Sequence, residues 1–135
     1  MNKQIFYLCL NKAGGQMEIK LQLREDIGII TFSGKTLGEP ADSKRFEQQL
    51  NELLERGVKK IVLDLTEVQR INSTGLAILI TATTLYSDCG EQKIVLTGSN
   101  DFINGALAVT KLNQFFEIYD TLDEALQQIK QTVCE

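Results

Sequence analysis

Two short apolar runs, Lys60–Leu65 and Lys93–Thr97, constrain the fold more than any other feature of the sequence. Each is followed by a stretch of helical periodicity, and runs of this kind are typical of strands that are buried on both faces of a parallel sheet. Parallel neighbours need a crossover connection, which a helix commonly supplies. The pattern therefore predicts an α/β fold with a mostly parallel sheet and helices packed against it.

An antiparallel hairpin is predicted to precede this alternation. Met17–Leu23 alternates apolar and polar residues, which is typical of a strand with one solvent-exposed face, and we expect it at the edge of the sheet. Ile27–Phe32 is the expected returning strand. The other predicted elements are helices at about 41–56, 74–87 and after Ser99, a strand at 116–119, and a helix opened by the capping box Thr121–Glu124. The predicted order is ββαβαβαβα, with about four helices.

Two details of these helices can be predicted by residue. Gly57 follows the first helix and is expected to close it in the left-handed conformation. The third helix is expected to bury an apolar side that consists of Phe102, Ile103, Ala106 and Leu107.

The length of the chain fits a single domain. Its 135 residues can bury a core but are too few for two domains. We assign residues 17–135 to the domain and residues 1–16 to an N-terminal extension, either flexible or the product of a misplaced start codon, and expect the fold to survive its removal. Ile5–Leu10 is too short for a signal-peptide core or a membrane span, so no membrane insertion is expected.

Charge and cysteine content exclude several classes of function. The net charge of −4 argues against a nucleic-acid surface, because phosphate backbones are bound by clustered Lys and Arg. Cys9, Cys89 and Cys134 lack CxxC spacing, so neither a disulfide framework nor a zinc site is predicted, and free thiols fit a reducing cytoplasm. The absence of histidine removes Ser-His and Cys-His nucleophile activation.

The sequence contains no recognisable catalytic machinery. Glycine motifs for nucleotides and clusters with metal-ligand spacing are missing, so no cofactor and no metal are expected. Asp64 and Glu67 are close in sequence, but two carboxylates without a histidine, lysine or third acid make a poor catalytic set, and we interpret Asp64 as structural. The chain is therefore predicted not to be an enzyme.

The strongest candidate site follows the strand that ends at Leu65. In open α/β sheets the functional surface lies beyond the carboxyl ends of the strands. Three loops are expected to converge there, at residues 33–38, 66–73 and 98–100. The next helix begins near Ser73, and its unpaired N–H groups and positive dipole end favour a side-chain oxygen or a phosphate.

Ser73 has two possible roles at this helix start. Its hydroxyl can be the N-cap. Asn72 can serve equally well, which leaves the hydroxyl of Ser73 free to face solvent. A phosphate on Ser73 would add roughly −1.5 to −2 charge, which the helix dipole tolerates while a partner's surface is repelled. Gly75 either allows another backbone to approach the helix start or fills a gap.

From residue 17 to residue 135 the sequence resembles the STAS domain family, whose soluble bacterial members are anti-sigma factor antagonists. The resemblance rests on Phe32–Gly34, on Ile61–Leu65 and above all on Ile71–Leu79. It implies a single-domain STAS fold. It also implies that the phosphoacceptor is the first hydroxyl residue of the last motif, Ser73, with Thr74 as the second choice.

The resemblance implies a phosphorylation-controlled binding switch. In that scheme the unmodified antagonist binds an anti-sigma factor that is also a serine protein kinase of the histidine-kinase-like ATPase type, and the sigma factor is released. Phosphorylation ends the complex, and the antagonist itself needs no ATP site. The predicted partner-binding surface consists of Leu37, Gly38, Asn72, Ser73, Thr74, Gly75, Leu76, Ser99 and Asn100.

Two positions depart from the family's pattern. Many regulated members carry Asp where this sequence has Asn72, and an acid in the loop after the second strand, where it has Leu37–Glu39. The loss of these charges is expected to weaken kinase recognition without weakening protein binding. Two other functions fit the resemblance, an accessory subunit of an ABC-type lipid-transport complex and a scaffold module that does not switch. The oligomeric state is left open.

Overall fold

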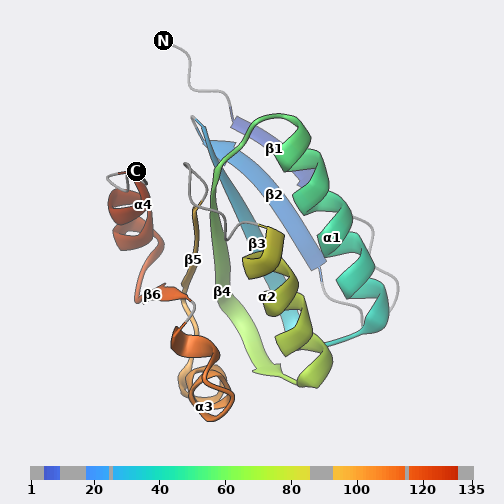
Figure 1. Cartoon of the computed structure of the whole chain (residues 1–135), viewed down its shortest axis with the longest axis vertical. Helices are drawn as coiled ribbons and strands as arrows, with labels where there is room; N and C mark the ends of the chain where they lie inside the picture. The colour runs from blue at the N-terminus through green and yellow to red at the C-terminus, as the bar shows by residue number, and fades with distance from the viewer. Residues whose placement is uncertain (1–4, 10–17, 25, 86–92, 115, 131–135) are drawn as a thin grey trace.

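The computed structural model describes residues 5–9, 18–24, 26–85, 93–114 and 116–130, and its strands and helices alternate after an initial run of three strands (Figure 1). In chain order the elements are β1 (Ile5–Cys9), β2 (Glu18–Arg24), β3 (Ile27–Leu37), α1 (Pro40–Glu55), β4 (Lys60–Ile71), α2 (Ser73–Leu85), β5 (Lys93–Thr97), α3 (Asp101–Val109), a 3-10 turn η1 (Leu112–Gln114), β6 (Glu117–Tyr119) and α4 (Leu122–Lys130). The predicted α/β class and the predicted order from the hairpin onward are confirmed.

The six strands form one sheet in chain order, from β1 to β6. The β1–β2 and β2–β3 pairs are antiparallel, whereas β3, β4, β5 and β6 are parallel neighbours. The parallel part follows from the crossovers, because α1, α2 and α3 each carry the chain back to the start of the next strand. The carboxyl ends of β3, β4 and β5 therefore meet at one edge of the sheet.

The first strand lies in the segment that the sequence assigns to an extension. Every residue of β1 has an antiparallel partner in β2, from Ile5 opposite Arg24 to Cys9 opposite Lys20. The prediction that the Met17–Leu23 strand lies at the edge of the sheet is therefore wrong, because β1 uses its outer hydrogen-bonding edge. The boundary at residue 17, and survival of the fold without residues 1–16, stay predictions.

The sheet carries a core on each face. The larger core joins β2–β5 to α1, α2 and α3, with Phe32 and Phe46 at its centre at a ring-centroid distance of 5.4 Å. The smaller core lies under α4 on the opposite face, and it consists of Ile27, Ile29, Val62, Val95, Ala125, Leu126 and Ile129. Because both faces are covered by helices, β4 and β5 are apolar on both sides, which explains the two runs that dominate the sequence.

The long strands β3 and β4 replace two of the predicted loops. Residues 33–37 and 67–71 continue the parallel pairing up to Leu37 opposite Ile71, so the prediction of loops at 33–38 and 66–73 is wrong over most of their length. A bulge interrupts the register between Thr31 and Ser33, where β4 has one residue more than β3. The side chain of Asp64 accepts hydrogen bonds from the backbone N–H and the hydroxyl of Thr66 at the bulge, at 3.0 and 2.6 Å. This contact supports a structural role for Asp64.

The helix ends agree with the predictions that can be examined. Gly57 has φ +83 and follows α1, and the N–H groups of Gly57 and Val58 bond to the carbonyls of Leu54 and Leu53. The hydroxyl of Thr121 accepts from the N–H of Glu124 at 3.2 Å, which is the N-cap bond of the predicted capping box. The predicted end of the second helix, at 86–87, lies outside the described residues.

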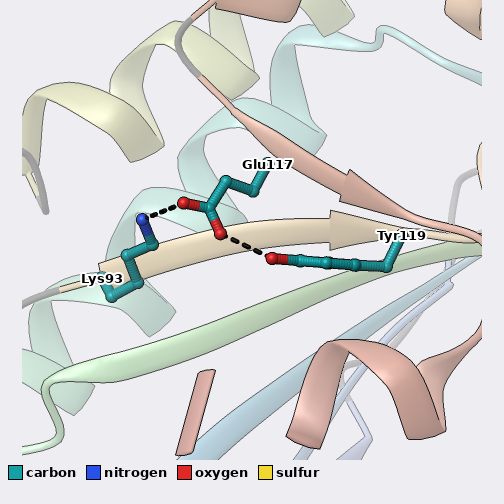
Figure 2. Close-up of polar contacts among 3 residues, drawn as sticks. All are labelled: Lys93, Glu117 and Tyr119. Atoms are coloured by element: carbon teal, nitrogen blue, oxygen red, sulfur yellow. Dashed lines mark hydrogen bonds and ion pairs between the residues drawn. The ribbon is translucent and has the colours of Figure 1, made fainter. Parts of the chain in front are cut away.

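A polar network fastens the short edge strand β6 to β5 (Figure 2). Lys93 Nζ donates to Glu117 Oε2 and Tyr119 Oη donates to Glu117 Oε1, both at 2.6 Å. The hydrogen bond from Lys93 lowers the pKa of Glu117, and the bond from Tyr119 lowers it further. The same bond to Glu117 raises the pKa of Tyr119 to about 12. The network ties together the strands on either side of α3.

Candidate functional site

The candidate site is the junction between the end of β4 and the start of α2. Ile71, the last residue of β4, is only 6% exposed and anchors the junction in the larger core. Ser73 is already the first residue of α2. Asn72 is thus the only residue between a buried strand and a helix, which fixes the place of the helix start.

Asn72 holds the junction together with four hydrogen bonds. Its backbone N–H donates to the carbonyl of Leu37 at 3.3 Å, and its carbonyl accepts from the N–H of Leu76 at 2.9 Å. Its side-chain Oδ1 accepts from the N–H of Gly75 at 3.0 Å, which makes Asn72 the N-cap of α2. Its Nδ2 donates to the carbonyl of Gly38 at 3.4 Å. The amide side chain therefore links the end of β3 to the first turn of α2.

Two glycines permit this close contact. A Cβ atom on Gly75 would overlap the carbonyl oxygen of Leu37, and a Cβ atom on Gly38 would overlap the side-chain amide of Asn72. Both glycines are buried. Of the two roles considered for Gly75, the structure supports the close approach of another backbone.

Ser73 is left free by this arrangement. Because Asn72 provides the cap, the hydroxyl of Ser73 makes no hydrogen bond within the described part of the chain, and the residue is exposed. Thr74, the second choice as phosphoacceptor, is half-buried. The two alternatives for the cap are thereby resolved in favour of Asn72.

The exposed face of α2 begins at Ser73 and carries no charge. Ser73, Ala77, Ile80 and Thr84 follow one another at helical spacing on the solvent side, and the side chain of Ile80 is 46% exposed. The whole helix from Ser73 to Leu85 lacks Asp, Glu, Lys and Arg. Surface helices usually carry charged residues on their outer face, so an uncharged outer face is typical of a contact surface.

The start of α3 lies beside the end of β4. Asn100 caps α3, because its Oδ1 accepts from the N–H of Ile103 at 2.9 Å. Its Nδ2 donates to the carbonyl of Gln69 at 3.0 Å, so the predicted convergence of the 98–100 loop with the β4 segment is confirmed. Gly98, with φ +80, makes the turn into this loop. The hydroxyl of Ser99 donates to Asn104 Oδ1 at 2.6 Å and is therefore bonded to a side chain of α3.

The predicted surface residues contribute in different ways. Leu37 is fully buried, and only its carbonyl takes part in the junction. Leu76 is half-buried against the larger core. Exposed side chains at the junction come from Asn72 and Ser73, and Asn100 is exposed at the start of α3.

Three residues near the site were not recognised from sequence. Phe102 was expected in the core, but its side chain is 53% exposed, because α3 buries Ile103 and Leu107 and Phe102 points away from that side. The guanidinium of Arg70 lies over its ring, 5.7 Å from the centroid. Ile80 was the third. The absence of charge along α2 was the signal that could have identified it.

Among the residues that the structure describes, no group of three or more His, Cys, Asp or Glu side chains could hold a metal ion. No helix in those same ranges is both long and apolar enough to cross a membrane.

Comparison with known proteins identifies the family. The model of the STAS domain matches residues 18–125, which is most of the chain. The chain belongs to the STAS domain family. Within it, a Thermotoga neapolitana protein described as a candidate anti-sigma factor antagonist is 31% identical over 80 residues, which are 59% of this chain and 70% of that protein.

Solved structures share the fold of this STAS domain. An anti-sigma factor antagonist from Mycobacterium paratuberculosis matches with a TM-score of 0.74 at 21% identity, over 90% of this chain and all of that one. The anti-sigma factor antagonist SpoIIAA in its unphosphorylated form matches with a TM-score of 0.59 at 11% identity, over 94% of this chain and all of that one. At these identities the likeness establishes the common architecture of the STAS domain.

Proposed function

We propose that this STAS domain is an anti-sigma factor antagonist whose binding surface is switched by phosphorylation of Ser73. The observation that carries the proposal is the exposed hydroxyl of Ser73, which makes no hydrogen bond to the residues that the structure describes and lies at the head of the uncharged outer face of α2. A relative described as a candidate anti-sigma factor antagonist supports the same role. The domain acts by binding another protein, and no reaction is assigned to it.

Phosphorylation is well suited to change this surface. A phosphate would bring roughly −1.5 to −2 charge to a helix face that now has none. The first turn of α2 tolerates the charge because N–H groups and the helix dipole are oriented toward it. The fold therefore persists in both states, while a partner packed on the uncharged face is repelled.

Asn72 is compatible with this switch. The cap needs an acceptor toward Gly75, which Asn and Asp both provide, but the link to Gly38 needs an N–H donor, which only Asn has. We infer that Asn72 preserves the geometry of the phosphoacceptor without the charge that the family resemblance leads one to expect at this position.

The partner of the proposed switch is an anti-sigma factor with serine kinase activity of the histidine-kinase-like ATPase type. Such a kinase transfers the γ-phosphoryl group of ATP to the oxygen of Ser73, ADP leaves, and the hydroxyl proton passes to a base of the kinase. Because the kinase supplies ATP, the STAS domain needs no nucleotide site. We place the pair in the cytoplasm, where ATP is available to the kinase.

Two variants test the proposal through partner capture. The wild-type protein, Ser73→Asp and Gln127→Glu are used as baits in a lysate of the host cell, and captured proteins are identified by mass spectrometry. Gln127→Glu is the matched control, because it adds the same charge on α4, on the other face of the sheet. We expect a histidine-kinase-like ATPase with the wild type and the control, and its loss with Ser73→Asp.

A reconstituted reaction completes the test. The captured ATPase and ATP should place a phosphate on the wild-type protein at Ser73 and none on Ser73→Ala. Equal capture by wild type and Ser73→Asp contradicts the switch. Capture of an ABC transporter subunit by all three baits replaces it with the accessory role in lipid transport.

A further inference from the structure

We propose that Arg70 is the cation that pairs with a phosphate on Ser73, and that in pairing it leaves the ring of Phe102. The inference rests on the proposed function, since it requires phosphorylation of Ser73. It adds a second event to the switch: the new charge at the start of α2 also changes the surface at the start of α3.

Arg70 is held by a weak contact in the unmodified protein. Its guanidinium lies 5.7 Å from the centroid of the Phe102 ring, and both residues are exposed. Within the described ranges, no carboxylate forms an ion pair with Arg70. A cation stacked on an exposed aromatic ring gains little free energy, because water competes for the charge. The guanidinium is therefore available to a stronger partner.

Ser73 is within reach of Arg70. The two residues are three positions apart, so their Cα atoms are separated by at most about 11 Å even in a fully extended chain. The backbone of the two intervening residues is held in place, because Ile71 is buried and Asn72 is hydrogen-bonded to Leu37 and Gly38. The long side chain of Arg70 can turn from one neighbour to the other while the backbone stays fixed.

A phosphate is the better partner of the two. Its oxygens accept two parallel hydrogen bonds from one guanidinium, which makes the pair both charged and bidentate. The upper bound of about 11 Å on the distance between the two Cα atoms is close to the Debye length of about 8 Å at physiological ionic strength, so salt screens the attraction between Arg70 and the phosphate only in part. Phosphorylation should accordingly draw Arg70 from Phe102 toward Ser73.

The exchange alters the partner surface in two places. The outer face of α2 gains the phosphate, and the start of α3 loses the cation that covers the ring of Phe102. A partner that fits the unmodified surface would meet both changes. Arg70 is a positioning residue in this scheme, since its contact with the partner is not required.

Nuclear magnetic resonance can test the exchange without a kinase or a partner. Phosphoserine is installed at position 73 during synthesis of the full chain, in the wild-type background, in Arg70→Gln and in Lys111→Gln. Lys111→Gln is the matched control, because it removes one positive charge, as Arg70→Gln does. Lys111 is exposed just beyond the end of α3, about 13 Å from Phe102 at the rise of an α-helix. The pH titration of the phosphate is followed by its phosphorus resonance, and the ring of Phe102 by its proton resonances.

We expect the second pKa of the phosphate, ordinarily about 6, to be about half a pH unit lower in the wild type and in Lys111→Gln than in Arg70→Gln. We also expect phosphorylation to shift the Phe102 ring resonances in the wild type but not in Arg70→Gln. The same phosphate pKa in all three proteins, or unmoved ring resonances in the wild type, overturns the inference. Neither result touches the proposed function, which the capture experiment tests by itself.

Discussion

The starts of α2 and α3 share the same kind of cap and differ in the charge of their first residue. In both helices an asparagine caps the first turn through Oδ1 and donates through Nδ2 to a carbonyl of a neighbouring segment, Asn72 in α2 and Asn100 in α3. The first helical residue is Ser73 in α2 and Asp101 in α3. The helix that has the acid carries a permanent negative charge at the place that its dipole favours. The other has a hydroxyl there.

The difference suggests how a charge can be made reversible. A phosphate on Ser73 would give α2 the negative charge that α3 already has in Asp101. The hydroxyl nearest to the start of α3, on Ser99, is engaged with Asn104, whereas that of Ser73 is not. Of the two helix starts, that of α2 therefore combines a first residue without charge with a hydroxyl that makes no hydrogen bond to the described residues.

The largest expected effect comes from the glycines of the two helices. Gly75→Ala should lower the free energy of unfolding by about 2–3 kcal/mol, because the new methyl group overlaps the carbonyl of Leu37. Gly105→Ala, in α3, should raise it by about 0.5–1 kcal/mol, because that site opens into free space. Urea unfolding of both variants measures the contrast. Equal midpoints for Gly75→Ala and the wild type would show that β3 does not constrain the start of α2.

The two asparagine caps should contribute similarly to the free energy of unfolding. Asn72→Ala and Asn100→Ala each remove a cap and a link to another segment, and each should lower the free energy of unfolding by about 1–2 kcal/mol. The same urea experiment serves as the measurement. A negligible loss for Asn72→Ala alone would show that the hydroxyl of Ser73 takes over as the cap, and the two helix starts would then differ in their caps as well as in the charge of their first residue.

Exchanging the first residues should produce smaller, opposite effects. Ser73→Asp should stabilise the domain by about 0.3–1 kcal/mol at low ionic strength, and Asp101→Ser should destabilise it by a similar amount, because each change acts through the helix dipole. Thermal unfolding at low salt and at 1 M salt measures both effects. They should largely disappear at high salt, where charges are screened. A loss of stability in Ser73→Asp would mean that α2 does not accept a negative charge.

The smallest expected effect concerns the strands on either side of α3. The folded-state pKa of Glu117 is lowered from 4.5, so its bonds stabilise the fold above that pH and are lost as the pH falls. The pKa of Tyr119 is raised from 10.0 to about 12, so its stabilisation is present below pH 10 and is lost as the pH rises toward 12. In Tyr119→Phe the alkaline loss between those values should vanish. Melting temperatures recorded as a function of pH measure this loss. If the loss between pH 10 and 12 persists in Tyr119→Phe, it does not come from Tyr119.

The buried parallel strands and the helices between them could be predicted from sequence. The runs at Lys60–Leu65 and Lys93–Thr97 are buried on both faces, and that pattern leaves few architectures open. The bulge in β4 could not be predicted, because no residue type at that position marks it. The strand beyond the bulge also lacks a regular alternation of buried and exposed residues. The pairing of β1 with β2 could not be predicted, because residues 11–16 interrupt the apolar pattern between the two strands.

The candidate site could be predicted only in part, because some of its contacts depend on tertiary structure. The motif around Ser73 located the junction, but the choice between Asn72 and Ser73 as the cap depends on where Leu37 and Gly38 lie, which is a matter of tertiary structure. Phe102 was misplaced because an aromatic residue at helical spacing normally belongs to the core. Its exposure becomes understandable only when Arg70 is seen above its ring.

The bulge in β4 makes the length of that strand critical to the site. Leu65, Val68 and Ile71 are all buried in the larger core. Because successive side chains of a strand point to opposite faces, removing one residue changes which of them reach that core. Deletion of Thr66 removes the extra residue of the bulge, so we expect Ile71 to leave its place in the core and Ser73 to lie one residue out of position at the helix start. An insertion or deletion between Asp64 and Ile71 should abolish the proposed switch without changing any residue of its surface, whereas substitutions at exposed positions of the same stretch should be tolerated.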